Sequence, residues 1–226
     1  MSKILVKENL YSSSGVPIYL NTKKFENEEE ISQVVNNIKN NFEYRTHQDW
    51  TGNVRTTATP YNEPGQSDEI LKIANPLLQS LAEDITCYLR DLNFDLDNYD
   101  WVIPEIWANK YYSNELQETH DHVSHRKDSK PSLLSLVYYP EDNDSHFFII
   151  NHSFYQNLSQ RWFIPETSVT GWFEPEAMVF KKNSIIIFPS FLEHNVSPIL
   201  KDGKQETERF TISMNIFAEH KGEKNG

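Results

Sequence analysis

Seven short segments between residues 101 and 216 are rich in isoleucine, valine, phenylalanine and tyrosine, and no helical pattern separates them. They cover residues 101–112, 119–124, 133–139, 146–150, 177–180, 184–188 and 209–216. Short strands joined by polar or proline-containing segments are typical of a β-sandwich or a β-barrel. The polar residues 181–183 are short enough to join two of these strands as a tight hairpin. This half of the chain therefore predicts a mainly β fold.

The first hundred residues show helical periodicity instead. Residues 27–42 carry apolar side chains at helical spacing, namely Ile31, Val34, Val35, Ile38 and Phe42. A second helix is expected after Ser67, which can cap it, and Pro76 is expected to kink or restart it. We expect one domain over residues 1–226, in which a helical support region (1–100) packs on the outside of a β-core (101–217).

Composition excludes several classes of function. The 226 residues carry a net charge of −12 and no long basic run, which disfavours binding to a phosphate backbone. A single cysteine, Cys87, rules out an internal disulfide and a multi-cysteine zinc site. No segment approaches the roughly 20 apolar residues of a membrane span, and the first residues lack the apolar run of a signal peptide. We expect a cytoplasmic protein with no membrane partner.

The segment Gln117–His122 contains a histidine pair that could bind a metal. Residues two apart share one face of a strand, so His120 and His122 would point together and Asp121 would point away. Two of the eight histidines could also fall at this spacing by chance. On its own, the pair therefore indicates at most half of a metal site.

A third candidate ligand, His194, lies shortly after an apolar strand that ends at Pro189. A histidine in this setting is usually a core residue bonded to a backbone carbonyl. It gains interest beside the distant pair, because two ligands close in sequence and one far along the chain suit a metal with open positions at the mouth of a barrel.

The last strand, residues 209–216, begins with an arginine. Alternation places Arg209 and Thr211 on one face of the strand. A buried arginine is costly unless it is paired, and its planar group suits a carboxylate, with Thr211 as a further donor. A salt bridge to one of the 33 acidic residues at the sheet edge is the alternative interpretation.

Taken in order, these segments resemble a group of 2-oxoglutarate/iron(II) oxygenases found widely in phages and bacteria. The matching motifs are Trp107-Ala108-Asn109, His120-Asp121-His122, Ser135-Leu136-Val137-Tyr138-Tyr139, residues 188–198 and residues 209–215. The resemblance covers roughly residues 101–217. It implies a double-stranded β-helix, the jelly-roll or cupin-like fold, with the metal at one open end.

The resemblance also implies a set of site residues. Iron(II) would bind His120, His122 and His194, and 2-oxoglutarate would chelate it while its far carboxylate pairs with Arg209 and Thr211. Tyr112 would lie near the oxoacid, as a tyrosine does in related hydroxylases. Oxygen would be the second cosubstrate, and no catalytic residue beyond the metal site is implied.

Two departures from the family pattern bear on the metal. Most of the superfamily has a carboxylate where this chain has His122, so the site would carry one negative charge fewer and hold iron(II) less strongly. Asp121 cannot replace it unless a bulge turns it inward. Leu136 stands where glycine is usual, so the nearby surface would be closed differently.

Alternatives remain open at this point. One is a cupin-like dioxygenase with three histidines and no oxoacid, another is a non-enzymatic β-helix used for binding or structure, and a third is a zinc site. The sequence does not identify the substrate, which could be a peptide, a protein or a small metabolite, nor the oligomeric state. The aromatic-rich loop at residues 151–173 is long enough to be a lid or simply to cover the barrel.

Overall fold

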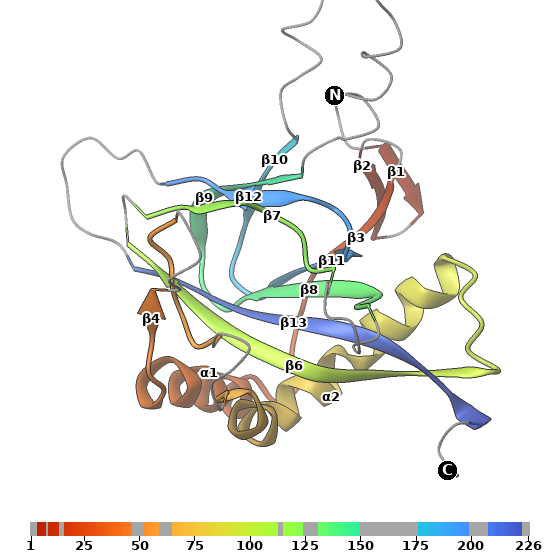
Figure 1. Ribbon diagram of the computed structural model, residues 1–226, viewed down its shortest axis with the longest axis horizontal. Coiled ribbons are helices and arrows are strands. Elements are labelled where there is room, and N and C mark those ends of the chain that lie inside the picture. Colours follow the sequence, from red (N-terminus) through yellow and green to blue (C-terminus); the bar gives the residue numbers. More distant parts are fainter. Residues whose placement is uncertain are drawn as a thin grey trace, which may run out of the picture.

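The computed structural model describes residues 4–7, 9–13, 16–46, 52–58, 65–112, 115–123, 131–149, 176–198 and 208–222. In these residues, two antiparallel sheets face each other and two helices cover the larger sheet from outside (Figure 1). This confirms the prediction of a double-stranded β-helix with supporting helices.

The larger sheet has nine strands. In spatial order they are β1 (Ile4–Lys7), β2 (Leu10–Ser13), β3 (Val16–Thr22), β11 (Ser184–Pro189), β8 (Leu134–Tyr139), β13 (Arg209–His220), β6 (Tyr99–Tyr111), β5 (Arg55–Thr56) and β4 (Arg45–Thr46). The smaller sheet has four, in the order β10 (Glu176–Phe180), β9 (Asn143–Ile149), β12 (His194–Val196) and β7 (Gln117–His120).

Alternation along β13 divides the interior into two packed regions. Phe210, Ile212, Met214 and Ile216 face the helices and join one hydrophobic cluster with them. The other face of the larger sheet meets the smaller sheet through a second cluster that includes Tyr139, Phe147 and Phe188. This second cluster surrounds the space in which the candidate site lies.

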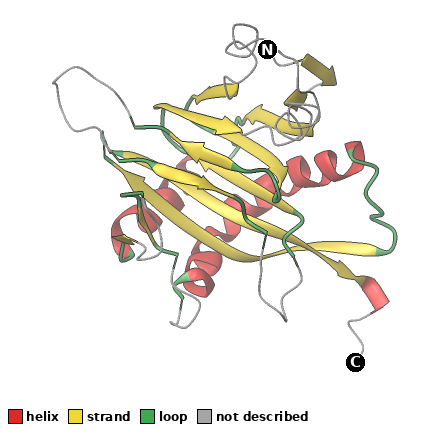
Figure 2. Ribbon diagram, turned by 45° about the horizontal axis from the view of Figure 1, so that its top comes forward, coloured by secondary structure: helices red, strands yellow, loops and turns green. Residues whose placement is uncertain are grey.

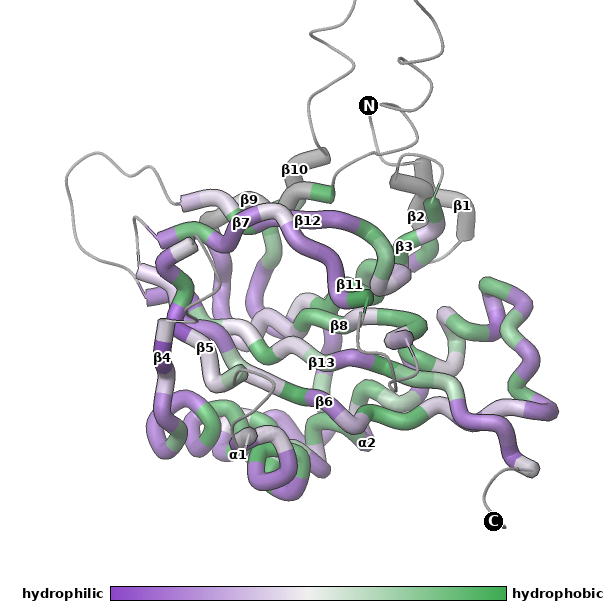
Figure 3. The backbone as a smooth tube through the Cα atoms, in the orientation of Figure 1, coloured by the Kyte–Doolittle hydropathy of each residue, from purple (hydrophilic) through white to green (hydrophobic). Residues whose placement is uncertain are grey.

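The helices are amphipathic, as the apolar spacing predicted. α1 (Glu28–Asn41) buries Ile31 and Ile38, and α2 (Ser67–Asp91) buries a row that includes Leu77, Leu81 and Ile85. Both helices lie on one side of the larger sheet (Figure 2), and hydrophilic and hydrophobic stretches alternate along them (Figure 3). Neither helix is apolar enough over a sufficient length to span a bilayer.

Two details of α2 differ from the expectations. The helix runs through Pro76 without a break, so it does not restart at the proline. Ser67 is the first helical residue rather than the cap, and its hydroxyl accepts a hydrogen bond from the backbone N–H of Ile106 on β6 instead. Ser67 therefore ties the start of the helix to the sheet.

Other elements differ from the sequence interpretation in their pairing. Residues 4–22 form three strands that extend the larger sheet, although only helices were expected in this region. Residues 181–183 do form a tight turn, with Asn183 at φ 64°, but β10 and β11 belong to different sheets. The turn therefore links the two sheets and is not a hairpin. The predicted lid at residues 151–173 lies outside the described residues.

Candidate metal centre

Three histidines meet on the inner side of the smaller sheet. His120 ends β7, His194 begins β12, and the two are directly paired across these antiparallel strands. His122 follows two residues after His120, where its backbone N–H donates to the carbonyl of Ser190. One ring nitrogen from each histidine lies within 4.8 Å of the others. The structure thus brings together all three histidines that the sequence singled out.

Hydrogen bonds fix which nitrogen each ring presents to the centre. Nδ1 of His120 lies 2.8 Å from the carbonyl of Glu118, and Nδ1 of His194 lies 3.0 Å from that of Leu192. Nδ1 of His122 lies 3.0 Å from the side-chain oxygen of Asn215. Because each of these partners is an acceptor, each Nδ1 carries the proton, and each Nε2 keeps its lone pair.

The spacing of these lone pairs suits a metal ion. Nε2 of His122 lies 3.2 Å from Nε2 of His120. Two imidazole nitrogens bonded to one metal at about 2.1 Å would lie roughly 3.0–3.4 Å apart. The Gln117 amide donates to Nε2 of His120 over 3.1 Å, which is consistent with a lone pair there. The donor set therefore fits a divalent transition metal.

Burial keeps the three imidazoles neutral. Burial first, and then the neighbouring His120, lower the pKa of His122 to about 3. The pKa of His194 falls well below its ordinary value for the same two reasons, burial first and then the neighbouring histidines. Burial also lowers the pKa of His120. Only the neutral ring can coordinate a metal, so all three are ready to bind at neutral pH.

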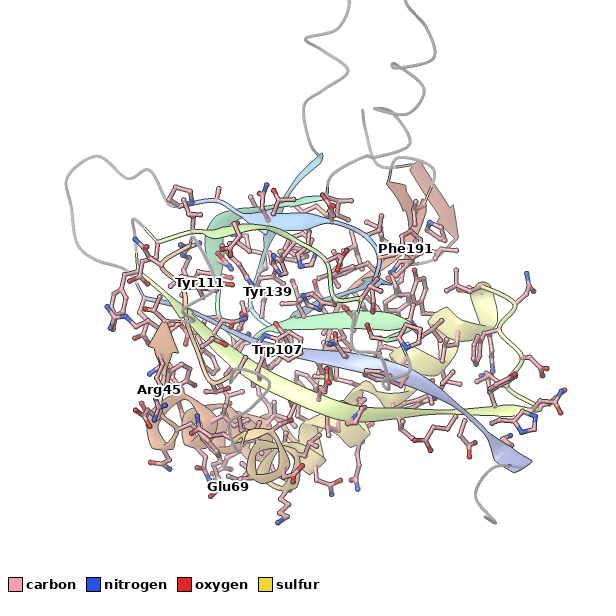
Figure 4. All side chains as sticks on the ribbon, viewed as in Figure 1. Arg45, Glu69, Trp107, Tyr111, Tyr139 and Phe191 are labelled. Carbon is pink, nitrogen blue, oxygen red and sulfur yellow. The ribbon has the colours of Figure 1, made fainter. Side chains whose placement is uncertain are left out.

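A pocket that is partly open to solvent adjoins the triad. It is lined by Trp107, Asn109, Tyr111, Gln117, His120, His122, Val137, Tyr139, Asn143, Phe147, His194, Val196, Thr211 and Ser213. The rings of Phe147 and His194 stack at 5.0 Å, and Trp107 lies 5.2 Å from His122. Tyr111, Tyr139 and Trp107 lie between the two sheets in Figure 4, whereas Glu69 projects from the helical side. Aromatic side chains thus pack closely around the metal ligands.

Arg209 is buried beside this pocket, with only 3% of its surface exposed. Its terminal nitrogens donate to the backbone carbonyls of Ser197, Tyr112 and Glu115, and its guanidinium lies 4.9 Å from the ring centre of Tyr111. Its Nε has no hydrogen-bond partner in the described part of the chain, and no carboxylate there forms an ion pair with it. Burial lowers the pKa of Arg209. A buried cation without a counterion is costly, so this position favours an anion.

Of the two other predicted contacts of the oxoacid, one faces the pocket and one does not. Thr211 lines the pocket, whereas Tyr112 points out of it: its ring lies under the guanidinium of Arg55 and its hydroxyl donates to Glu208. Tyr111 lines the pocket instead. Strand alternation could have identified Tyr111 from the sequence, because Tyr111 shares a strand face with Trp107 and Asn109.

Asp121 points away from the histidines, as expected, although β7 ends at His120 and strand alternation does not extend to it. Its carboxylate accepts from the backbone N–H of Val123 over 3.0 Å and does not belong to the histidine cluster. Two further polar residues lie in the matched motifs but were given no role from the sequence. Asn109 has a buried side-chain oxygen without a partner among the described residues, and Asn215 contacts His122. Their place on the inner face follows from the same alternation that exposes Thr211 to the pocket.

Comparisons with known proteins support the fold. No protein-family model matches the chain, and no curated protein matches its sequence. Among solved structures, the 2-oxoglutarate-dependent epimerase SnoN from nogalamycin biosynthesis is similar with a TM-score of 0.58 and 9% identity, over 90% of this chain and 80% of its own. HygX from Streptomyces hygroscopicus, solved with nickel and 2-oxoglutarate, gives 0.56 and 9%, over 88% and 82%.

A third similar structure is an oxidoreductase of the 2-oxoglutarate/iron(II) oxygenase family from Burkholderia pseudomallei, with a TM-score of 0.52 and 11% identity over 88% of this chain and 84% of its own. At such identities the likeness establishes the fold alone. The chain therefore has the double-stranded β-helix of these oxygenases, as the sequence motifs predicted.

Proposed function

We propose that this protein is a non-haem iron(II) oxygenase that couples the decarboxylation of 2-oxoglutarate to the hydroxylation of a substrate. The observation that carries the proposal is the convergence of three Nε2 lone pairs on a pocket beside which a guanidinium lies buried, with no ion pair to it among the described residues. A metal and a dicarboxylate satisfy both features at once. The fold it shares with 2-oxoglutarate enzymes supports the same conclusion.

His120, His122 and His194 would hold iron(II) through Nε2, leaving coordination positions for the oxoacid and for oxygen. When bound, the metal and the oxoacid supply the oxidising chemistry. The net reaction converts 2-oxoglutarate, O₂ and a C–H bond into succinate, CO₂ and an alcohol. The chain itself positions the ligands and excludes water with the rings of Trp107 and Phe147.

Arg209 and Thr211 would receive the far carboxylate of 2-oxoglutarate. A carboxylate would give the Arg209 Nε an acceptor that it lacks among the described residues, and would add a counterion to a cation held by three backbone carbonyls and the ring of Tyr111. Thr211 lines the pocket and would add a hydroxyl donor. Tyr112, whose side chain points away, is replaced in this scheme by Tyr111, whose hydroxyl now donates to Gln117.

The decisive experiment is succinate formation by the reconstituted protein. We expect iron(II), added without oxygen, to bind stoichiometrically, and succinate to appear once oxygen is admitted in the presence of 2-oxoglutarate. His194→Ala removes a ligand and should abolish both iron binding and succinate formation. Iron binding by His194→Ala equal to that of the parent would show that the triad is not the metal site.

The all-imidazole donor set favours a second candidate. A dioxygenase of the cupin type uses three histidines without an oxoacid, and no carboxylate joins the three histidines here among the residues that the structure describes. Such an enzyme would bind iron(II) at the same residues but would give no spectral change with 2-oxoglutarate. A protein that binds neither would be better explained as a non-enzymatic β-helix. The substrate of the favoured reaction could be a peptide, a protein or a small metabolite.

A further inference from the structure

His122 differs from the other two histidines in what holds its ring. His120 and His194 each donate Nδ1–H to a backbone carbonyl, a group that can only accept, so the main chain itself fixes their tautomers. His122 faces the side-chain amide of Asn215, which can present either an oxygen or an NH₂ group. The nitrogen that His122 offers to a metal therefore depends on the orientation of one amide.

A row of three residues across the larger sheet determines that orientation. Asn215 on β13 is directly paired with Glu105 on β6 and with Ser135 on β8. Its Nδ2 donates to the Glu105 carboxylate over 3.0 Å, and its oxygen accepts from the Ser135 hydroxyl over 3.1 Å. The same oxygen lies 3.0 Å from Nδ1 of His122.

Glu105 is the member of this row that cannot tolerate a rotated amide. A hydroxyl can donate or accept, so Ser135 would satisfy either orientation of Asn215. An ionised carboxylate can only accept, and a rotated amide would turn its oxygen toward that negative charge. Rotation would also present NH₂ to Nδ1 of His122, which would move the ring proton to Nε2 and block the metal-binding lone pair.

We propose that Glu105 and Asn215 are positioning residues, which fix His122 in the Nδ1–H tautomer and so keep its Nε2 available to the metal. The inference deepens the proposed function, because it takes the triad to be a metal site. It also gives an electrostatic role to Glu105, a carboxylate outside the group of three histidines. Groups that orient metal-bound histidines in this way typically change metal affinity about 10–100-fold when they are removed.

Charge reversal at Glu105 tests the proposal, since Glu105 is exposed and its replacement leaves the core intact. Glu105→Lys would donate to the amide oxygen and favour the rotated orientation, so we expect cobalt(II) affinity to fall about 10–100-fold. Glu105→Gln can still accept from Asn215 and should stay close to the parent. Glu69→Lys, on the far side of the helices, is the control for net charge (Figure 4).

A second substitution should reverse the effect. Asn215→Asp in the Glu105→Lys background replaces the amide by a carboxylate, which has no NH₂ group to present. It would accept from His122 whichever way it turns and would pair with the new lysine. We therefore expect the double variant to recover cobalt(II) binding, whereas a merely structural defect at residue 105 would not be repaired by a second change.

The tautomer itself can be measured in the metal-free protein by long-range ¹H–¹⁵N correlation spectra of the histidine rings. We expect His122 to be protonated at Nδ1 in the parent and at Nε2 in Glu105→Lys. An Nδ1–H tautomer and parent-like cobalt(II) affinity in Glu105→Lys would overturn the proposal. If the tautomers behave as expected but no protein, parent included, binds metal, the positioning role stands and the proposed function fails.

Discussion

Replacing Arg209 with alanine tests the cosubstrate site most directly, because it removes a buried cation that forms no ion pair within the described part of the chain. The guanidinium donates to the carbonyls of Ser197, Tyr112 and Glu115 at 3.0, 3.2 and 2.7 Å. Leaving such acceptors without partners costs about 1–3 kcal/mol each where water cannot reach them. We therefore expect Arg209→Ala to lower the free energy of unfolding as well as ligand affinity.

The effect on 2-oxoglutarate should exceed the effect on iron(II). Truncating one member of a buried, hydrogen-bonded charge pair costs about 2–5 kcal/mol, and about 1.4 kcal/mol corresponds to a factor of ten. Arg209→Ala should thus weaken 2-oxoglutarate binding by more than about thirtyfold. Iron(II) binding should change little, since no metal ligand contacts Arg209. Arg209→Lys should recover only part of the affinity, because an ammonium keeps the charge but lacks the planar fork.

The assay is a titration of 2-oxoglutarate into the anaerobic iron(II) protein, followed by the metal-to-ligand charge-transfer absorbance. Lys110→Ala is the matched control, because it removes a cation from the neighbouring strand β6. The Lys110 amine lies over the ring of Tyr44, on the helical side. Equal affinity in the parent and in correctly folded Arg209→Lys and Arg209→Ala would remove Arg209 from the site. An unchanged spectrum in the parent would refute the 2-oxoglutarate assignment itself.

Three further results are expected. His122→Asp should restore the commoner carboxylate pattern and keep measurable iron(II) binding, whereas Asp121→Ala should leave iron(II) affinity unchanged. Metal titrations that show the reverse would make Asp121 the ligand. Burial lowers the pKa values of the three site histidines, so the unfolded chain binds more protons than the folded one below about pH 6.5. The metal-free protein should therefore lose stability as the pH falls below that value, by up to about 1.4 kcal/mol per pH unit for each histidine; denaturant melts with the same midpoint at pH 7.5 and 5.5 would contradict this. Asp84 on α2 is only 3% exposed and accepts hydrogen bonds from three side chains on and just after β3. Asp84→Ala should therefore lower the free energy of unfolding by about 3–5 kcal/mol in a thermal or denaturant melt. Lys72→Ala, at an exposed position on the same helix, should change it little.

The strands that the sequence predicted are those whose own alternation is strong. The predicted segments 133–139, 184–188 and 209–216 lie within one or two residues of β8, β11 and the first part of β13. Of the three missed N-terminal strands, β1 and β2 pair only with their chain neighbours, and β3 joins this group to the larger sheet through the distant β11. In β3, for example, Leu20 pairs with Ile186, far along the chain. β12 has only three residues, too few for a periodic signal.

The candidate site was predictable in its ligands but not in their support. The pattern around His120 assumed a strand continuing to residue 124, yet β7 ends at His120. His122 is positioned instead by the backbone of Ser190 and the side chain of Asn215, both distant in sequence. Tyr112 was chosen by analogy although the alternation of Trp107 and Asn109 favours Tyr111. A resemblance locates a motif, whereas the strand period decides which residue of it faces the pocket.

The polar face of β13 explains why one strand matters to both halves of the site. Its alternating residues Arg209, Thr211, Ser213 and Asn215 follow one another on the inner face, from the buried guanidinium at one end to the contact with His122 at the other. The same strand would hold the far carboxylate of an oxoacid and orient a metal ligand. Local periodicity placed Arg209, Thr211 and Ser213 on this face, and the same alternation continues to Asn215. It could not assign a role to Asn215, because that role depends on Glu105, a cross-strand neighbour 110 residues away in sequence.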